Sequence, residues 1–349
     1  MRPLGSNLRG TSAICVGIPA YNRCAEMNEL LQSIYEQTVL PAEITICEDH
    51  SPQRAEIRSL VDSWRSRFLS ESCHLNYHEN ETNLGYDGNV RKVIEISRSP
   101  WVMLMGNDDL LLPECIESTQ RFIASNRQIR MISRSFVLFE NDLQVGRGIS
   151  RLAAEDRVFS PDNSSPAMIF RTCGFIGGLI VNRDWAAAIG TERYDGSLYY
   201  QIFLAAVAFC EGGIGYISRT TVGGRMGNTP LFGSAATERT VHVPGSYTPK
   251  GRADMWASVL RIAKEVGARY DIDLLSEMRM ELEVRQSFHI FEMMAGAGRA
   301  RLTELRDEFQ KIGLFAHPIP RLLYAIDLLF GARAVAFYRA VRVLKRWAT

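Results

Sequence analysis

The first part of the chain alternates short apolar runs with segments whose apolar residues recur every three or four positions. The apolar runs predict strands at 14–19, 43–49, 74–79 and 101–105. The helical periodicity predicts helices at 26–37, 55–68, 89–97 and 113–125. Because such alternation requires right-handed crossovers, we expect a mostly parallel sheet flanked by helices on both faces.

The pattern becomes less regular after the next predicted strand, which ends at residue 139. Strands are predicted at 131–139, 174–182 and 214–218, and a helix at 197–210. Residues 219–250 are rich in Gly, Thr, Pro and Ser without periodicity, which predicts a long active-site loop or flap. From residue 251 the pattern is helical, with breaks at 296–298 and 317–320. We therefore expect an α/β catalytic domain over 1–250 and a helical C-terminal region over 251–349.

Composition and charge narrow the class of protein. The 349 residues are 46% hydrophobic and 23% charged, as in an ordinary globular protein, and the net charge of +1 gives no general attraction to nucleic acid. We expect no nucleic-acid partner. The seven cysteines are scattered and form no C-x-x-C pair, which argues against a zinc ribbon or a disulfide framework. With neither a signal-like N-terminus nor an uncharged run of spanning length, the expected compartment is the cytoplasm.

Polar residues follow the first four predicted strands where each one ends. They are Pro19-Ala20-Tyr21-Asn22-Arg23, Glu48-Asp49-His50-Ser51, Asn83-Leu84-Gly85 and Asn107-Asp108-Asp109. Since ligands of such sheets bind at the carboxyl ends of the strands, these sets should converge on one crevice. A G-x-G-x-x-G turn and a P-loop are both absent. The crevice therefore suits a nucleotide whose diphosphate is neutralised by a divalent cation such as Mg²⁺ or Mn²⁺.

These motifs together resemble the glycosyltransferase family 2 enzymes of GT-A fold. PAYNR follows the first strand, EDHS stands where the family has a D-D-G-S-like segment, NLG follows, and NDDLLLP stands at the D-x-D-D-like segment. The resemblance covers about residues 14–113. It implies that Pro19, Tyr21, Arg23, Asp49, Asn83, Gly85, Asn107 and Asp108 bind a nucleotide-sugar and that Asp108 and Asp109 hold the metal. Gly106 departs from the family, because it stands where the first acid of D-x-D usually is.

The resemblance also implies a reaction, which is transfer of a sugar from a nucleoside diphosphate to a hydroxyl with inversion at the anomeric carbon. A carboxylate takes the proton of the acceptor hydroxyl. Asp195 is the nearest candidate for this base and Glu192 the second. In the predicted flap, Arg225 is expected to bind the diphosphate and His242 to add a metal ligand.

Structural explanations compete with several of these roles. Asp108 and Asp109 could cap the helix near Pro113, Asp49 could cap the helix after Pro52, and Asn83-Leu84-Gly85 could form only a turn. Asp195 and His242 could be solvent-exposed loop residues, Arg225 need not meet phosphate, and Tyr21 could be a core aromatic.

The C-terminal segment carries apolar residues at helical spacing and basic residues on its other faces. The apolar set is Ala334, Phe337, Tyr338, Val341 and Leu344; the polar and interfacial set is Arg333, Arg339, Arg342, Lys345, Arg346 and Trp347. Such a helix suits an anionic membrane surface, and it equally suits docking on the catalytic domain or on a second subunit. Membrane contact at the inner face would fit a lipid-linked acceptor.

The sequence thus predicts a metal-dependent glycosyltransferase of cell-surface polysaccharide biosynthesis that acts on a glycan or lipid-linked acceptor. Two alternatives stay open. One is a catalytically idle GT-A-like protein that binds nucleotide-sugars or serves as a scaffold, because Gly106 replaces an acid. The other is a nucleotidyltransferase, although GIPAYNR lacks the glycine-rich basic loop that such enzymes carry after the first strand.

Overall fold

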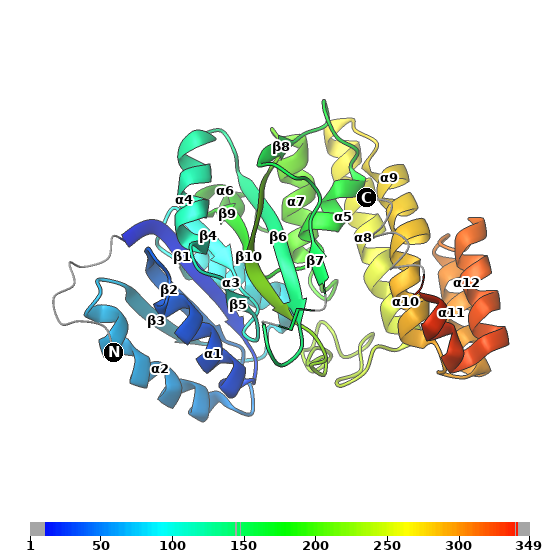
Figure 1. Ribbon diagram of the computed structural model, residues 1–349, viewed down its shortest axis with the longest axis horizontal. Helices are drawn as coiled ribbons and strands as arrows, with labels where there is room; N and C mark the ends of the chain where they lie inside the picture. Colours follow the sequence, from blue (N-terminus) through cyan, green and yellow to red (C-terminus); the bar gives the residue numbers. More distant parts are fainter. Residues whose placement is uncertain (1–10, 144, 147, 339, 341–349) are drawn as a thin grey trace.

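The computed structural model describes residues 11–143, 145–146, 148–338 and 340. Its described strands form one ten-stranded sheet in the order β3-β2-β1-β4-β9-β6-β10-β5, with β7 paired to β6 and β8 to β10 (Figure 1). The strands are β1 (Thr11–Ala20), β2 (Leu40–Glu48), β3 (His74–Glu79), β4 (Trp101–Leu104), β5 (Leu110–Leu111), β6 (Met131–Phe139), β7 (Gly148–Ser150), β8 (Arg157–Phe159), β9 (Leu179–Asn182) and β10 (Ile214–Arg225).

The first half of the sheet is parallel, as predicted. β1 lies between β2 and β4, so that Val16 pairs with Ile44 on one side and with Met103 on the other. Apolar residues of β1 alternate between two cores. Ile14 and Val16 pack with α1 (Cys24–Tyr35), α2 (Arg54–Leu69) and α4 (Cys115–Ser125), whereas Cys15 packs with α3 (Gly85–Ile96) on the opposite face. Both faces are thus covered, which explains the nearly unbroken apolar runs.

The second half of the sheet is mixed. β9 is antiparallel to β4 and to β6, and it begins at Leu179 because residues 174–178 form a turn rather than the start of the predicted strand. β10 pairs in parallel with β6 as far as Arg225. The predicted flap therefore begins after residue 225 and not at 219. The direction of β9 could not be predicted, because an apolar run has the same pattern in a parallel and in an antiparallel strand. The extension of β10 to Arg225 could not be predicted either, because small polar residues do not prevent a segment from pairing in a sheet.

Helices α5 (Ala167–Cys173), α6 (Arg183–Ala188) and α7 (Tyr200–Cys210) complete the α/β part. The helical region consists of α8 (Pro249–Tyr270), α9 (Leu274–Met280), the π-helix η1 (Glu281–Gln286), α10 (Ser287–Met294), α11 (Arg299–Lys311), α12 (Pro318–Phe330) and the short η2 (Gly331–Arg333). In Figure 1 these helices stand beside the sheet, at the side opposite β3. Their apolar residues join those of α7 in one continuous core, where Trp256 stacks on Phe309 at 5.1 Å.

The described part of the C-terminal segment docks on the protein. Ala334 and Tyr338 are buried, and the Tyr338 hydroxyl donates to Asp327 of α12 at 2.7 Å. Phe337 is exposed. The remaining residues of the predicted amphipathic helix, Arg339 and 341–349, lie outside the described residues, so membrane contact stays a prediction. None of the helices in the described ranges combines the length and the apolar character that a bilayer crossing requires.

Candidate active site

The predicted strand-end residues do converge on one cavity, of about 990 Å³. Of the residues predicted to bind the nucleotide-sugar or its metal, all but His242 line it: Pro19, Tyr21, Arg23, Asp49, Asn83, Gly85, Asn107, Asp108, Asp109 and Arg225. The 226–248 segment, part of the predicted flap, contributes to the wall. The wall is completed by residues of β6, α5 and the η1–α10 helix, and sequence reasoning did not connect these three elements with the site. Convergence was predictable because parallel strands end at one edge; the rest of the wall depends on long-range packing.

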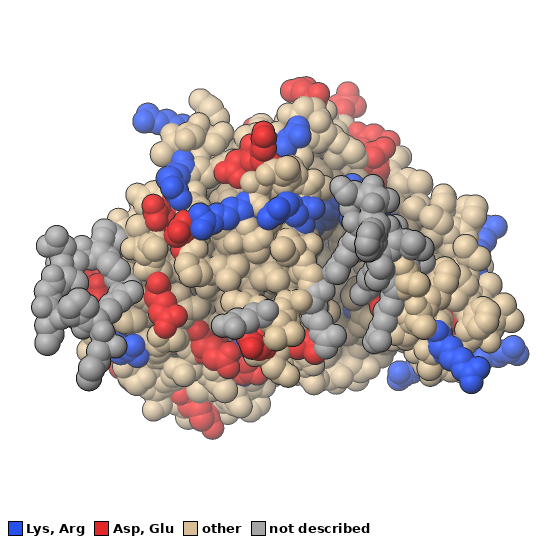
Figure 2. All heavy atoms as spheres, in the orientation of Figure 1, with Lys and Arg blue, Asp and Glu red and all other residues tan. Residues whose placement is uncertain are grey.

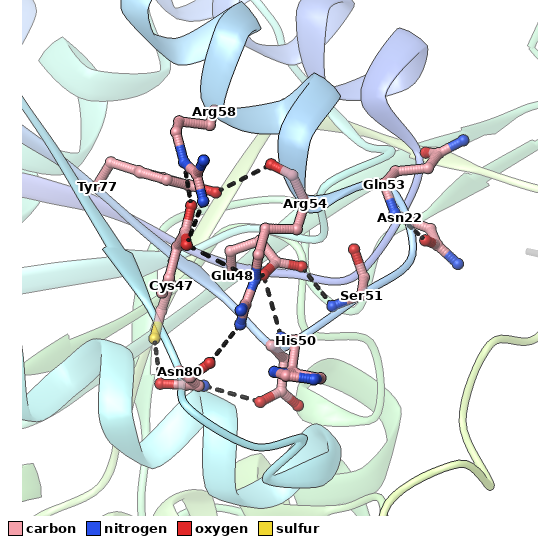
Figure 3. Close-up of polar contacts among 12 residues, drawn as sticks. Asn22, Cys47, Glu48, His50, Ser51, Gln53, Arg54, Arg58, Tyr77 and Asn80 are labelled. Atoms are coloured by element: carbon pink, nitrogen blue, oxygen red, sulfur yellow. Dashed lines mark hydrogen bonds and ion pairs between the residues drawn. The ribbon is translucent and has the colours of Figure 1, made fainter.

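The turn after β2 is held by a network of charged hydrogen bonds (Figure 3). The buried Glu48 carboxylate accepts from the backbone amides of His50 (3.1 Å) and Ser51 (2.7 Å) and from Arg54 Nε (2.9 Å). Arg58 in turn binds Glu79 with two hydrogen bonds of 2.7 Å. Glu48, rather than Asp49, therefore supports the start of α2. The capping role considered for Asp49 at this helix is wrong.

Asp49 instead joins the ends of β2 and β3 to the start of α3. Its carboxylate accepts from the amides of Leu84 (2.8 Å) and Gly85 (3.0 Å) and from Asn80 Nδ2 (2.8 Å). Burial raises the pKa of Asp49 to about 6, against the opposing effect of these donors. Asp49 is thus a buried acid whose two oxygens are already hydrogen-bonded, at the wall of the cavity.

The Asn83-Leu84-Gly85 segment is both a turn and part of the wall. Asn83 Oδ1 accepts from the Gly85 amide at 2.9 Å, and Gly85 has φ of +79°, a conformation that favours glycine. A Cβ at Gly85 would also lie 2.7 Å from Glu238 Oε1. Because these contacts satisfy the first amides of α3, the helix begins at Gly85 and not at the predicted residue 89.

Asp108 is paired with a cation and an amide. Its Oδ2 accepts from Arg23 Nη1 at 2.5 Å and from Asn228 Nδ2 at 2.7 Å. Arg23 has a left-handed φ of 61° and also donates to the carbonyl of Thr229 at 2.9 Å. Helix α4 begins only at Cys115, and no hydrogen bond from its amides to the two acids is found among the described residues. The capping explanation for Asp108 and Asp109 is therefore wrong.

Asp109 is buried deeper than its neighbour. Its Oδ1 accepts from the Arg225 amide at 3.1 Å, and burial together with the Asp108 charge holds its pKa well above the usual range. The space around Oδ2 is closed by glycines: a Cβ would lie 2.5 Å from this atom at Gly106 and 2.4 Å at Gly177. Glycine at 106, the position of the missing acid, thus makes room for the carboxylate that follows.

Asn107 and Arg225 connect this carboxylate turn to its surroundings. Asn107 Nδ2 donates to the Asn22 carbonyl at 2.8 Å, which ties the ends of β1 and β4 together. Arg225 Nε donates to the Asp108 carbonyl at 2.9 Å, and its guanidinium also pairs with Glu29. Arg225 is therefore a strand-end residue held in place by protein partners. Its binding to phosphate stays a prediction.

A second buried arginine, Arg134 of β6, lies beneath the carboxylate turn. It donates to the carbonyls of Thr172 (3.1 Å), Phe175 (3.1 Å) and Gly177, and its positive charge acts on Asp109. Burial lowers the pKa of Arg134 to about 10. Sequence reasoning missed this residue, because a single arginine within an apolar strand shows no partner until the turn at 172–177 is folded against it.

Residues 226–248 cover the cavity as the predicted flap should. Met226, Asn228, Phe232 and Tyr247 are among those that line it. The segment is fastened by the buried Glu238, which accepts from the amides of Tyr86 at 2.7 Å and Gly233 at 2.7 Å. Glu238 was also missed, because the segment lacks periodicity that would indicate a buried acid.

The structure does not bring three of the predicted residues to the cavity. Asp195 forms two hydrogen bonds with Arg91 of α3, one of 2.9 Å, and Glu192 lies 3.7 Å from the same guanidinium. Neither lines the cavity. His242 is buried within the 226–248 segment and packs against Phe232, so it is not a surface histidine, and it does not line the cavity. Asp195 is thus a partner of Arg91 in this arrangement.

Two of the described residues, Asp108 and Asp109, could hold a metal. Among the described residues no group of three His, Cys, Asp or Glu is arranged to hold an ion. Asp108 Oδ1 and Asp109 Oδ2 nevertheless accept no hydrogen bond from the part of the chain that the structure describes. Mg²⁺ commonly takes one or two carboxylates and completes its shell with substrate phosphates and water. The donor set therefore fits an ion bound mainly through a diphosphate.

Comparison with known proteins finds a family that resembles the first part of the chain. Residues 15–174 match the model described as Glycosyl transferase family 2. This part of the chain is therefore similar to glycosyl transferase family 2. The matched residues, which are less than half of the chain, run from β1 through α5 and so include all four strand-end motifs.

Two curated relatives resemble parts of the chain. Abequosyltransferase RfbV of Salmonella typhimurium is 27% identical over 218 residues, which are 59% of this chain and 64% of RfbV. An uncharacterized glycosyltransferase of Haemophilus influenzae is 30% identical over 115 residues, 33% of this chain and 36% of the relative. The chain thus spans less than two thirds of each of these relatives.

A solved structure supports the fold over nearly the whole chain. The crystal structure of S. aureus TarS in complex with UDP-GlcNAc superposes with a TM-score of 0.62 at 16% identity, and the match covers 96% of this chain and 92% of the TarS chain. The TarS complex with UDP gives a TM-score of 0.57 at 14% identity. The predicted fold class, a GT-A-type α/β sheet with a helical C-terminal region, is confirmed.

Proposed function

We propose that this protein is a glycosyltransferase that moves a sugar from a nucleoside-diphosphate sugar to a hydroxyl of a glycan or lipid-linked acceptor. The observation that carries the proposal is the cavity at the strand ends, where Asp49, Asp108 and Asp109 lie in one wall of a domain similar to family 2. The names of the relatives, an abequosyltransferase and TarS bound to UDP-GlcNAc, support a nucleotide-sugar donor and a role in bacterial cell-surface polysaccharide biosynthesis. The alternative, a catalytically idle protein that binds nucleotide-sugars, would use the same cavity but would not cleave the donor.

The proposed donor site uses the residues at the ends of β1, β2 and β4. Tyr21 and Asp49 would contact the base and ribose, and Arg23 would stand by the diphosphate. Asp108 and Asp109 would hold Mg²⁺ or Mn²⁺, which when bound neutralises charge that develops on the departing diphosphate. Arg23 Nη1 lies 2.5 Å from Asp108 Oδ2, so its guanidinium would lie beside an ion held by Asp108.

The proposed reaction inverts the anomeric carbon, which requires a base on the acceptor side of the sugar. In the described part of the chain, four carboxylates line the cavity, namely Asp49, Asp108, Asp109 and Glu238. We place the base among these four. We further propose that the protein works in the cytoplasm, in contact with the inner face of the membrane when the acceptor is lipid-linked.

A nucleotide panel tests the proposal. The unfolding temperature is measured with UDP, GDP, CDP, dTDP and ADP, each with and without Mn²⁺ or Mg²⁺, on the intact chain and on Asp108→Asn. A ligand at 100 times its dissociation constant stabilises the folded state by about 2.7 kcal/mol. The expected result is stabilisation by one nucleotide that depends on the metal and is lost in Asp108→Asn. Arg121→Gln, on the exposed face of α4, serves as the matched control.

Release of nucleotide from the corresponding sugar donor is then measured over hours. Slow hydrolysis of the donor supports a transferase, since water replaces the missing acceptor. Binding of the nucleotide without any hydrolysis identifies the idle alternative. If none of the nucleotides stabilises the protein, the proposed function is wrong.

A further inference from the structure

The cavity carries two sets of charged side chains that come from different parts of the fold. The carboxylates lie at the strand ends and on the 226–248 segment, as described above. Three further arginines line the wall formed by the end of β7, α5 and η1, namely Arg151, Arg171 and Arg285. Arg23 and Arg225 are bound to Asp108 in the strand-end site, and Arg134 is bound to the carbonyls of Thr172, Phe175 and Gly177. These three arginines already have partners and are not part of the second set.

The second set has more positive than negative charge. Arg171 Nε lies 2.7 Å from Glu281 Oε2, and Arg285 Nε lies 3.7 Å from Oε1 of the same residue. The Glu281 side chain is fully buried. Arg151 has no ion pair or hydrogen bond with the described residues. The Glu281 carboxylate thus pairs with two of the three guanidinium groups and not with Arg151, which leaves an excess of two positive charges among these four side chains.

These arginines remain accessible to a ligand. The side chain of Arg285 is 61% exposed and that of Arg171 is 35% exposed, although both belong to the cavity wall. The planar guanidinium group binds carboxylate and phosphate through two parallel hydrogen bonds. A wall with three such groups and a single buried acid favours an anionic ligand over a neutral one.

The local helix geometry brings this set together. Residues 281–286 form a π-helix, a feature frequent at functional sites. Its wider turn leaves Glu281 in the core beside Arg171, while Arg285, Gln286 and His289 line the cavity. Gln286 Nε2 donates to Glu281 Oε1 at 2.8 Å, which fixes the carboxylate that Arg171 and Arg285 share. The helical region thus contributes directly to the site.

We infer that this wall, which we call the arginine wall (Arg151, Arg171 and Arg285), binds an anionic group of the acceptor, a phosphate or a carboxylate. The inference rests on the proposed function, because it names the acceptor class of the same cavity. The donor occupies the strand-end carboxylates, and the acceptor enters along the helical region with its charge on the arginine wall. The acceptor is then a lipid diphosphate-linked glycan or an acidic glycan, rather than a neutral one.

The test uses the intact chain saturated with the nucleoside diphosphate that binds in the panel, and repeats the titrations without nucleotide. Calorimetric titrations compare geranyl diphosphate, trigalacturonate and the neutral maltotriose. The variants are Arg151→Gln, Arg285→Gln and the double variant. Arg171 is left unchanged because its loss would strip buried Glu281 of its partner at 2.7 Å. Arg121→Gln, 63% exposed on α4 and outside the cavity lining, is the matched control.

At least one anionic probe is expected to bind, and the double variant is expected to weaken it about tenfold or more, since charge-assisted hydrogen bonds are lost. Nucleotide binding and the Arg121→Gln variant should show no change. The inference is wrong if neither anionic probe binds, if maltotriose binds as tightly as both, or if the double variant keeps the affinity. The probe that responds separates a lipid diphosphate from an acidic glycan. Failure of the nucleotide to bind overturns the proposed function, and the titration without nucleotide still tests the arginine wall.

Discussion

Gly106 offers a direct test of why this chain lacks the first acid of D-x-D. A Cβ at this position would lie 2.5 Å from Asp109 Oδ2 and 3.3 Å from Asp108 Oδ1. Ordinary contacts of a Cβ begin near 3.4 Å, so the Asp109 carboxylate would have to move by almost 1 Å. It cannot move freely, because Oδ1 is bound to the Arg225 amide and Gly177 closes the other side.

We therefore expect Gly106→Ala to lower the free energy of unfolding by about 1–3 kcal/mol, the usual effect of overpacking a core. Gly106→Asp, which restores the missing acid, should lower it further because it adds a second negative charge beside a buried carboxylate. Urea unfolding of the full chain measures both changes, with the midpoint compared at constant slope. This loss of unfolding free energy should be measurable without any ligand.

The decisive control is the same substitution in an Asp109→Ala background. Removing the carboxylate removes the atom that the new Cβ would meet, so Gly106→Ala should then cost close to nothing or stabilise slightly by restricting the unfolded chain. The difference between the two backgrounds is the coupling energy of residues 106 and 109. An equal loss in both backgrounds would refute the reasoning, since the clash with Asp109 could not be its cause.

Three further predictions concern residues around the cavity. Between pH 4 and 6 the folded state holds a proton on Asp49 that the unfolded chain has lost. The free energy of unfolding should therefore fall as pH rises, by roughly 3 kcal/mol in total. Urea unfolding followed against pH should show this fall in the intact chain and not in Asp49→Asn. Glu238→Ala should free residues 226–248 from α3 and raise their hydrogen exchange, while α2 exchanges as before; unchanged exchange would contradict its fastening role. Asp195→Ala should lower the free energy of unfolding by about 1–3 kcal/mol, because the hydrogen bonds with Arg91 are lost. It should leave donor hydrolysis intact. Loss of hydrolysis in a stably folded variant would restore Asp195 as the base.

The sequence alone determined the parallel half of the fold and the strand-end wall of the cavity. The apolar pattern of strands predicted β3 and β6 with their observed bounds. The polar residues after β1, β2, β3 and β4 are among those that line the cavity. These features are local, since a strand's apolar run and the polar residues directly after it are adjacent in the chain. Their convergence follows from the rule that parallel strands end at one edge.

Tertiary structure decided the rest, because it depends on contacts between distant residues. The direction of β9 and the pairing of 219–225 come from neighbours in the sheet, and an apolar run does not encode either. Asp195 faces Arg91, 104 positions away, instead of the cavity, and the arginine wall is assembled from β7, α5 and the helical region. The strand ends thus define one wall of the cavity, and long-range packing defines the other walls.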